Sequence, residues 1–133
     1  MRVFHFLSVI AICVLFISAK PTDLLNAKGK ITMLRTHDVG TKYGPPTDQI
    51  DVEAVIQLDT KPGMAFGFQL RDDAQRVARV GMLDLLHDAF RNNWTVSIDY
   101  NIAPLKKNGV IIRVWVVKDP TVPVTTTTTA STN

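Results

Sequence analysis

The chain is almost without cysteine. It has one, Cys13, among 133 residues, and three histidines. A structural zinc site takes four ligands, mostly cysteine and histidine, so metal centres built on thiolates are excluded. Many small secreted domains rely on disulfides, but a chain with one cysteine cannot form one internally. The folded part must therefore be stabilised by its hydrophobic core alone.

The one long apolar run lies at the N-terminus. Met1-Arg2 is followed by VFHFLSVIAICVLFISA, residues 3–19, and then by Lys20-Pro21. A short positive start, an apolar middle and a small residue at Ala19 are typical of a secretory signal peptide. The alternative, a stable membrane anchor, is disfavoured because the run is near the lower limit of about 17 residues for a spanning helix. We predict residues 1–19 to be a cleaved signal peptide and the protein to be secreted.

The chain also lacks a large excess of positive or negative charge. Loss of Arg2 with the signal leaves 14 basic residues (15 less one) against 12 acidic ones, a net charge of +2. This excess is too weak to indicate nucleic-acid binding, so no nucleic-acid partner is expected.

The C-terminal tail has little that could form a core. Residues 119–133, DPTVPVTTTTTASTN, contain five consecutive threonines and two prolines. We predict a disordered tail, either unmodified or carrying O-linked sugars. Residues 20–27 are predicted to be a short leader, which leaves 28–118 as the folded domain.

Alternating apolar and polar residues predict five strands. IDVEAVIQLD (50–59) and MAFGFQL (64–70) flank a Pro-Gly turn and form a hairpin, and a strand at 28–39 precedes them. After the helix described next, strands are expected at 94–100 and 110–118. Their predicted core faces carry Trp94, Val96, Ile98 and Tyr100, and Val110, Ile112, Val114 and Val116.

Between the third and fourth strands the apolar period lengthens to three or four residues. This predicts an amphipathic helix over 73–91, with 81–91 as its surer part because Gly81 disfavours a helix interior. Its apolar stripe is broad. It comprises Val77, Val80, Leu83, Leu86 and Phe90, widened by Met82, Leu85 and Ala89.

The order strand–strand–strand–helix–strand–strand predicts a mainly β protein with one helix. It is the order of an OB-fold-like barrel of five strands, in which the broad helix covers one end. The alternative is an α+β sheet with one packed helix.

GMLDLLHDAFRNNWTVSIDY (81–100) joins a helix directly to an aromatic-rich strand. In this layout the chain resembles the binding subunits of bacterial AB5 toxins, particularly the subtilase type, over roughly 31–117. The cysteines that usually brace those subunits are missing here, and no sugar-binding residue can be carried over. The resemblance implies that such a fold can bind glycans and form rings.

The residues that could carry catalysis or bind metal are scattered. His37-Asp38 at a strand end and His87 beside Asp84 on the helix lack the partners of a catalytic or metal site. Ser97 and Asp99 share one strand face, which we expect to be solvated. The acidic residues Asp48, Asp51, Glu53 and Asp59 follow strand alternation rather than a calcium-loop spacing, so a polar outer face is expected. We predict no enzyme and no cofactor.

Ligand binding is the better prediction. OB-folds bind ligands on the face of strands two and three, flanked by the loops after strands one and four. Those loops carry Lys42 and Tyr43, and Lys106 and Lys107, while Arg113 and Trp115 share the outer face of the last strand. The function expected is a secreted, non-enzymatic binding module for a glycan or an extracellular protein. The alternative is a homo-oligomeric structural or inhibitory protein with Trp115 in its interface.

Asn93-Trp94-Thr95 matches the acceptor pattern for an N-linked sugar. Asn93 also ends the predicted helix, where asparagine readily adopts the left-handed conformation. Both roles are compatible, and Asn93 is a predicted glycosylation site.

Overall fold

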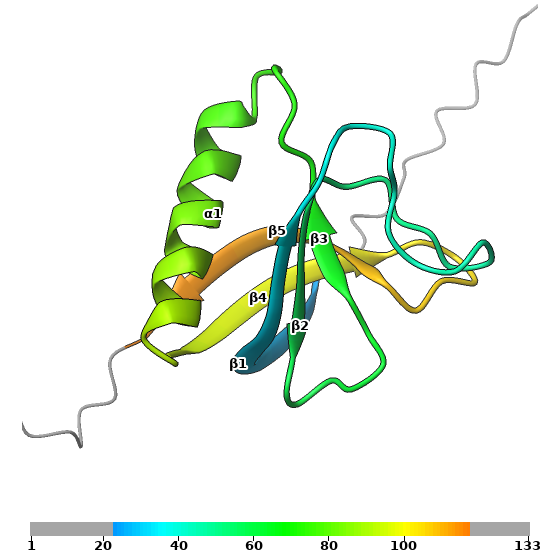
Figure 1. Cartoon of the computed structure of the whole chain (residues 1–133). Helices are drawn as coiled ribbons and strands as arrows, with labels where there is room; N and C mark the ends of the chain where they lie inside the picture. Colours follow the sequence, from blue (N-terminus) through cyan, green and yellow to red (C-terminus); the bar gives the residue numbers. More distant parts are fainter. Residues whose placement is uncertain (1–22, 118–133) are drawn as a thin grey trace, which may run out of the picture.

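The computed structural model describes residues 23–117 (Figure 1). The elements are β1 (Leu25–Thr36), β2 (Ala54–Leu58), β3 (Phe66–Phe68), α1 (Arg76–Arg91), β4 (Thr95–Ile102) and β5 (Gly109–Val116). The predicted order of elements is confirmed, although β1 begins at Leu25 rather than at residue 28. The predicted signal peptide and Thr-rich tail lie outside the described residues.

β1 closes the sheet because its two halves pair with different strands. Residues 25–30 pair antiparallel with β4, and residues 31–36 pair antiparallel with β2. The register shifts between Ile31 and Met33, where the extra residue bends the strand. With antiparallel β2–β3 and β4–β5 pairs and a parallel β3–β5 pair, the strands close into a barrel in the order β1-β2-β3-β5-β4. The predicted OB-fold-like arrangement of five strands and one helix is therefore confirmed.

The interior of the barrel is filled by alternate residues of the strands, as the apolar pattern predicts. The largest side chains are Phe66 and Phe68 of β3, and the ring of Phe66 meets Tyr100 edge to face at 4.7 Å. The rest of this cluster comes from β1, β2, β4, β5 and α1: Ala27, Ile31, Ala54, Ile56, Leu58, Leu86, Ala89, Val96, Ile98 and Ile111.

A second, smaller apolar cluster lies on the outer side of β2. It consists of Ile50, Val52, Val55 and Ala65, with Met33 and Tyr43 packed against it. Val55 is the one residue of the strand that breaks the alternation, and this cluster explains why. The loop between β1 and β2 folds back over the outer face of the sheet and covers Val55.

The same loop is tied down by a buried carboxylate. Glu53 is 2% exposed, and its two oxygens accept hydrogen bonds from the backbone of Leu70 at 2.8 Å and from the Arg71 guanidinium at 3.0 Å. The same guanidinium pairs with Asp51 at 2.7 Å. The prediction of a solvated face was therefore wrong for Glu53, because Arg71 supplies the charge partner that permits burial.

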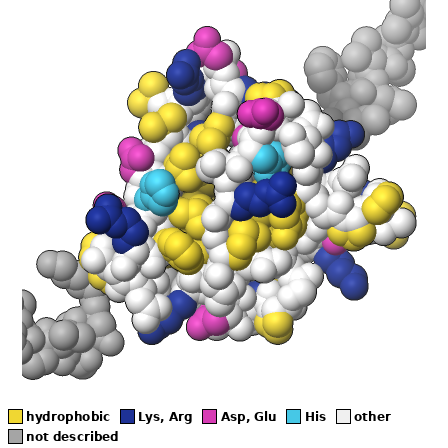
Figure 2. Space-filling view, viewed as in Figure 1, with side chains coloured by type: hydrophobic (Ala, Val, Ile, Leu, Met, Phe, Trp, Pro, Cys, Tyr) yellow, Lys and Arg dark blue, Asp and Glu magenta, His cyan; other side chains and the backbone are white. Residues whose placement is uncertain are grey.

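α1 lies against β1, β4 and β5 (Figure 1). The contact is made from Met82 onward: Leu86 and Ala89 are buried, and Met82 and Leu83 pack beside them. The predicted stripe was too long, since Val77 is 86% exposed and Val80 and Phe90 are also exposed. Figure 2 shows a strip of hydrophobic side chains still visible between α1 and the strands.

Along β5 the residues that face the core change from odd to even positions. Asp99 pairs with Arg113 and Tyr100 with Ile111, so Ile112 is an extra residue in the ladder. This bulge turns Ile111 inward and leaves Val110 and Ile112 exposed, although both were predicted to face the core. Beyond the bulge, Val114 and Val116 pack against the core as predicted.

Alanine substitutions at two glycines should change the stability of the fold in opposite directions. A Cβ on Gly67 would lie 2.5 Å from the Ala54 carbonyl oxygen and 2.6 Å from Val52 Cγ2, whereas a Cβ on Gly81 of α1 meets nothing within 4 Å. We expect Gly67→Ala to lower the free energy of unfolding by about 2 kcal/mol through overpacking. Gly81→Ala should raise it by about 1 kcal/mol through helix propensity. Urea denaturation measures both changes. If Gly67→Ala left the free energy of unfolding unchanged, the close packing of Val52 against Gly67 would be contradicted.

The Asp51–Arg71 pair predicts a pH dependence. The hydrogen bond from Arg71 holds the pKa of Asp51 below its ordinary value of 3.8. A depressed pKa stabilises the fold above that ordinary value, and the contribution disappears as the pH falls through the lower, folded-state pKa. Asp51→Asn should therefore be less stable than wild type at neutral pH and converge with it below pH 3.8 in urea titrations. The exposed helix variant Asp84→Asn is the control, and an unchanged gap at low pH would contradict the prediction.

Candidate ligand-binding cleft

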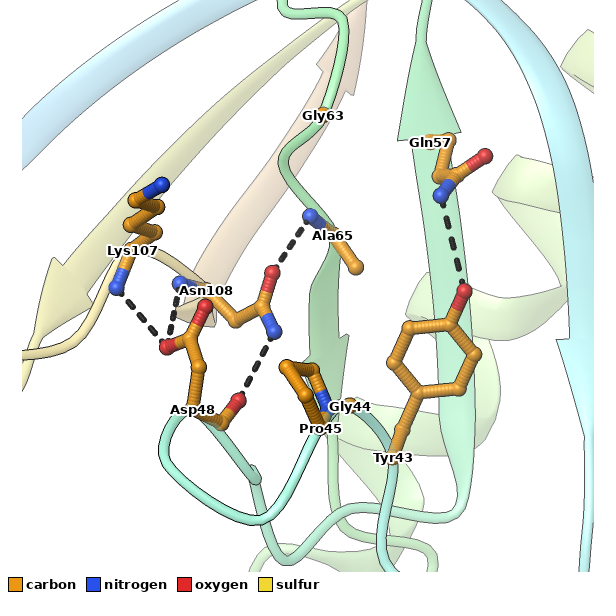
Figure 3. Close-up of a pocket in the computed structure, with 9 residues that line it drawn as sticks. All are labelled: Tyr43, Gly44, Pro45, Asp48, Gln57, Gly63, Ala65, Lys107 and Asn108. Atoms are coloured by element: carbon orange, nitrogen blue, oxygen red, sulfur yellow. Dashed lines mark hydrogen bonds between the residues drawn. The ribbon is translucent and has the colours of Figure 1, made fainter.

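A cleft of about 290 Å³ opens where three loops meet on the outer side of β2 and β3 (Figure 3). We call residues 37–53 the first loop, 59–65 the hairpin turn and 103–108 the last loop. The first loop contributes Tyr43, Gly44, Pro45 and Asp48; Gln57 of β2, Gly63, Ala65, Lys107 and Asn108 complete the lining. This is the region in which OB-folds bind oligonucleotides and oligosaccharides.

Asn108 joins all three loops. It is 5% exposed, and its side-chain oxygen accepts a hydrogen bond from the backbone N–H of Ala65 at 2.8 Å. Its amide nitrogen donates to the carbonyl oxygen of Asp48, also at 2.8 Å. Gly44 packs tightly here, because a Cβ on it would lie 2.9 Å from the Asn108 amide nitrogen.

Asp48 fixes the last loop from the other side. One carboxylate oxygen accepts hydrogen bonds from the backbone N–H groups of Lys107 at 2.8 Å and Asn108 at 3.2 Å. Lys106 Nζ donates to the carbonyl oxygen of Thr47 at 3.0 Å, which adds a further tie between the two loops. The cleft floor is thus held by contacts within the chain, and its shape is set before any ligand arrives.

Tyr43 forms one wall of the cleft. Its backbone exchanges two hydrogen bonds of 2.9 Å with Ile50, which closes the first loop into a narrow hairpin. The Arg35 guanidinium lies 5.6 Å from the centre of the Tyr43 ring, and Gln57 donates to the Tyr43 hydroxyl at 3.4 Å. The ring is therefore held in place while it lines the cleft (Figure 3).

Two of the three non-glycine residues of the described chain with left-handed backbone lie in the first and last loops, and the third, Asn93, follows α1. Lys42 in the first loop has φ 57°, and Leu105 in the last loop has φ 63° with its side chain fully exposed. Left-handed backbone costs a residue with a side chain about 1 kcal/mol or more and is frequent at ligand-binding sites.

The structure divides the six predicted ligand residues into two groups. Lys42, Tyr43, Lys106 and Lys107 lie in the first and last loops, but of these four only Tyr43 and Lys107 line the cleft. Arg113 and Trp115 lie elsewhere, since Trp115 follows Gly109 by six residues, about 20 Å along β5. Arg113 pairs with Asp99 at 2.8 Å, and Trp115, which is 37% exposed, lies opposite Ser97 on β4.

The weaker candidates are not brought together. Neither His37 nor His87 lines the cleft. Both ring nitrogens of His37 are buried without a hydrogen-bond partner, and His87 is on an exposed face of α1. Ser97 is buried rather than solvated, and Asp99 is engaged by Arg113 and Asn26. Within residues 23–117 no three histidine, cysteine or acidic residues form a metal-binding group.

Sequence reasoning missed the two residues that build the cleft. Asn108 is not among the predicted ligand residues, and Asp48 is expected only as part of a polar face. Their contact spans sixty residues of chain, and no local pattern signals it. Glycine and proline at Gly44-Pro45 do mark a loop, but not its return across the sheet.

Asn108→Ala tests the junction of the three loops. It removes the partner of the buried Ala65 N–H, and leaving such a group unpaired costs about 2 kcal/mol in unfolding free energy. Hydrogen exchange at the Ala65 amide should accelerate. Lys107→Ala is the control, because Lys107 reaches Asp48 through its backbone and should change stability by less than about 0.5 kcal/mol. Equal effects of the two variants would rule out the bridging role of Asn108.

No helix of the described region, residues 23–117, is long and apolar enough to cross a membrane. A scan against models of protein families and searches of curated proteins and of solved structures found no match.

Proposed function

We propose that this protein is a secreted, non-enzymatic binding module that holds a saccharide in the cleft between the first and last loops. The observation that carries the proposal is the construction of the cleft. Asp48 and Asn108 use their polar atoms to hold the loops together. Tyr43, Gln57 and Lys107 line the opening, with the Gln57 amide donating to the Tyr43 hydroxyl.

The dimensions suit a small polar ligand. A volume of about 290 Å³ lies at the lower end of the range for small-molecule sites. A protein partner would need about 800 Å² of matching surface on each side, much more than this cleft offers. A sugar ring combines hydroxyl groups with an apolar C–H face, which fits polar groups arranged beside an aromatic ring.

The same features argue against catalysis. The carboxylate that borders the cleft, Asp48, already accepts two backbone hydrogen bonds. A general base needs to reach a proton of the substrate, and neither histidine of the described chain is at the cleft. The residues present are those of a recognition site.

Secretion is supported by the sequence. The apolar segment 3–19 with Ala19 has the form of a signal peptide, and the mature chain would carry no thiol. The likeness in layout to AB5 toxin binding subunits accords with extracellular glycan binding.

A glycan array followed by calorimetry tests the proposed function. Tyr43→Ala and Lys107→Ala should each weaken binding of the selected saccharide by about tenfold, since each removes one contact of the cleft. Trp115→Ala should leave binding unchanged, because Trp115 lies far along β5. An array without binding, or a larger loss in Trp115→Ala than in Tyr43→Ala, would contradict the proposal.

One observation favours a second function, self-assembly through β5. Val110, Ile112 and Trp115 of β5 are partly exposed, as is Val117 just after the strand, and the exposed Arg113 lies between Ile112 and Trp115. Exposed apolar side chains around a paired arginine suit an interface between copies of the chain. Light scattering should then show an oligomer that Trp115→Ala or Ile112→Lys converts to monomer, while Val39→Lys on the first loop has no effect. A wild-type monomer at high concentration would exclude this function.

A further inference from the structure

The turn between α1 and β4 has a defined helix-ending geometry. The backbone N–H of Trp94 donates to the Ala89 carbonyl at 2.9 Å, and that of Asn93 donates to the Phe90 carbonyl at 3.4 Å. Asn93 has φ 54°, so the two bonds and the left-handed residue form a Schellman motif. Helix capping thus explains an asparagine at position 93. It does not explain the aromatic residues on either side.

Phe90 and Trp94 flank Asn93, and each is 45% exposed. Trp94 was predicted to face the core, but it precedes β4 and its backbone is committed to the helix end. Large aromatic side chains are usually well buried. Two exposed ones at a single turn therefore suggest that another group packs over them. The described part of the chain does not provide it.

We propose that Asn93 carries an N-linked glycan and that its first N-acetylglucosamine packs against Phe90 and Trp94. Asn93-Trp94-Thr95 has the acceptor pattern, and Asn93 is exposed at a turn. The apolar C–H face of the sugar ring would cover aromatic surface that is otherwise wet. The inference rests on the proposed secretion, since the modifying machinery acts in the secretory route.

The covalent step requires a polyprenyl-pyrophosphate-linked oligosaccharide as the sugar donor. The side-chain amide nitrogen of Asn93 forms a bond to C1 of the first N-acetylglucosamine. The C1–O bond to the pyrophosphate breaks, the pyrophosphate leaves with the electron pair, and the amide gives up one proton.

The glycan would leave the cleft open. The turn between α1 and β4 lies at the end of the molecule away from the first and last loops (Figure 1). A sugar chain on Asn93 is thus compatible with ligand binding and would shield the end of the barrel where α1 meets β4.

The first experiment expresses the full chain in eukaryotic secretory cells, once with its own leader and once with the leader of a host protein. The Asn93 peptide is then analysed by mass spectrometry after amidase release of the glycan, which converts a modified asparagine to aspartate. We expect one glycan on wild type and on Thr95→Ser, and none on Thr95→Val, which keeps a β-branched side chain. Asn92→Gln, beside the acceptor, is the matched control and should stay modified.

The two proposals fail differently. A chain that stays in the cytosol with its own leader overturns secretion, and the arm with the host leader still tests Asn93. A chain that is secreted with Asn93 unmodified overturns the glycan.

The second experiment tests the packing of the sugar. Removal of the glycan should lower the Tm of wild type by about 4 °C, the shift that loss of one aromatic-type contact produces in a domain of this size. The aspartate left by the amidase tolerates the left-handed backbone, so the helix end is preserved. In the double variant Phe90→Ala/Trp94→Ala the shift should vanish. An equal shift in that variant would overturn the packing against these rings.

Discussion

The division of β1 between two partners is the constraint on which the molecule depends. One strand of twelve residues gives its first half to β4 and its second half to β2, and the bulge near Thr32 lets it turn between them. Without this bend the five strands would form an open sheet with two bare edges. Closure places Phe66, Phe68 and Ile98 in one interior, and α1 covers that interior with Leu86 and Ala89. The described residues contain no cysteine, so this closed core is stabilised without a disulfide.

A second layer outside the barrel shapes the proposed ligand site. The first loop crosses the outer face of β2 and packs Ile50 and Val52 on Val55. Glu53 and Arg71 hold its C-terminal end, and Asp48 with Asn108 holds its middle. The face that comparable barrels leave open is therefore partly occupied by the chain itself. What remains is a small cleft at the meeting point of three loops rather than a broad groove.

Local patterns predicted the elements well and the exceptions poorly. Alternation and the change of period identified five strands and the helix, because each pattern reflects which face is buried. The errors occur where a bulge or a long-range partner intervenes. The extra residue Ile112 reverses the face of β5, and Arg71 makes a buried residue of Glu53. The loops of the cleft could be named from fold order, but the contact of Asp48 with Asn108 could not, since it depends on how distant segments meet.

The parallel joint between β3 and β5 has a mechanical consequence. It consists of two residue pairs, Phe66 with Gly109 and Gly67 with Val110, whereas β4 and β5 share seven. Sheets open first where the fewest backbone bonds must break. Asn108 and Ala65 adjoin this joint and also line the cleft. A ligand bound in the proposed site would therefore also bridge the joint with the fewest residue pairs, and local opening of the barrel there would require the ligand to leave first.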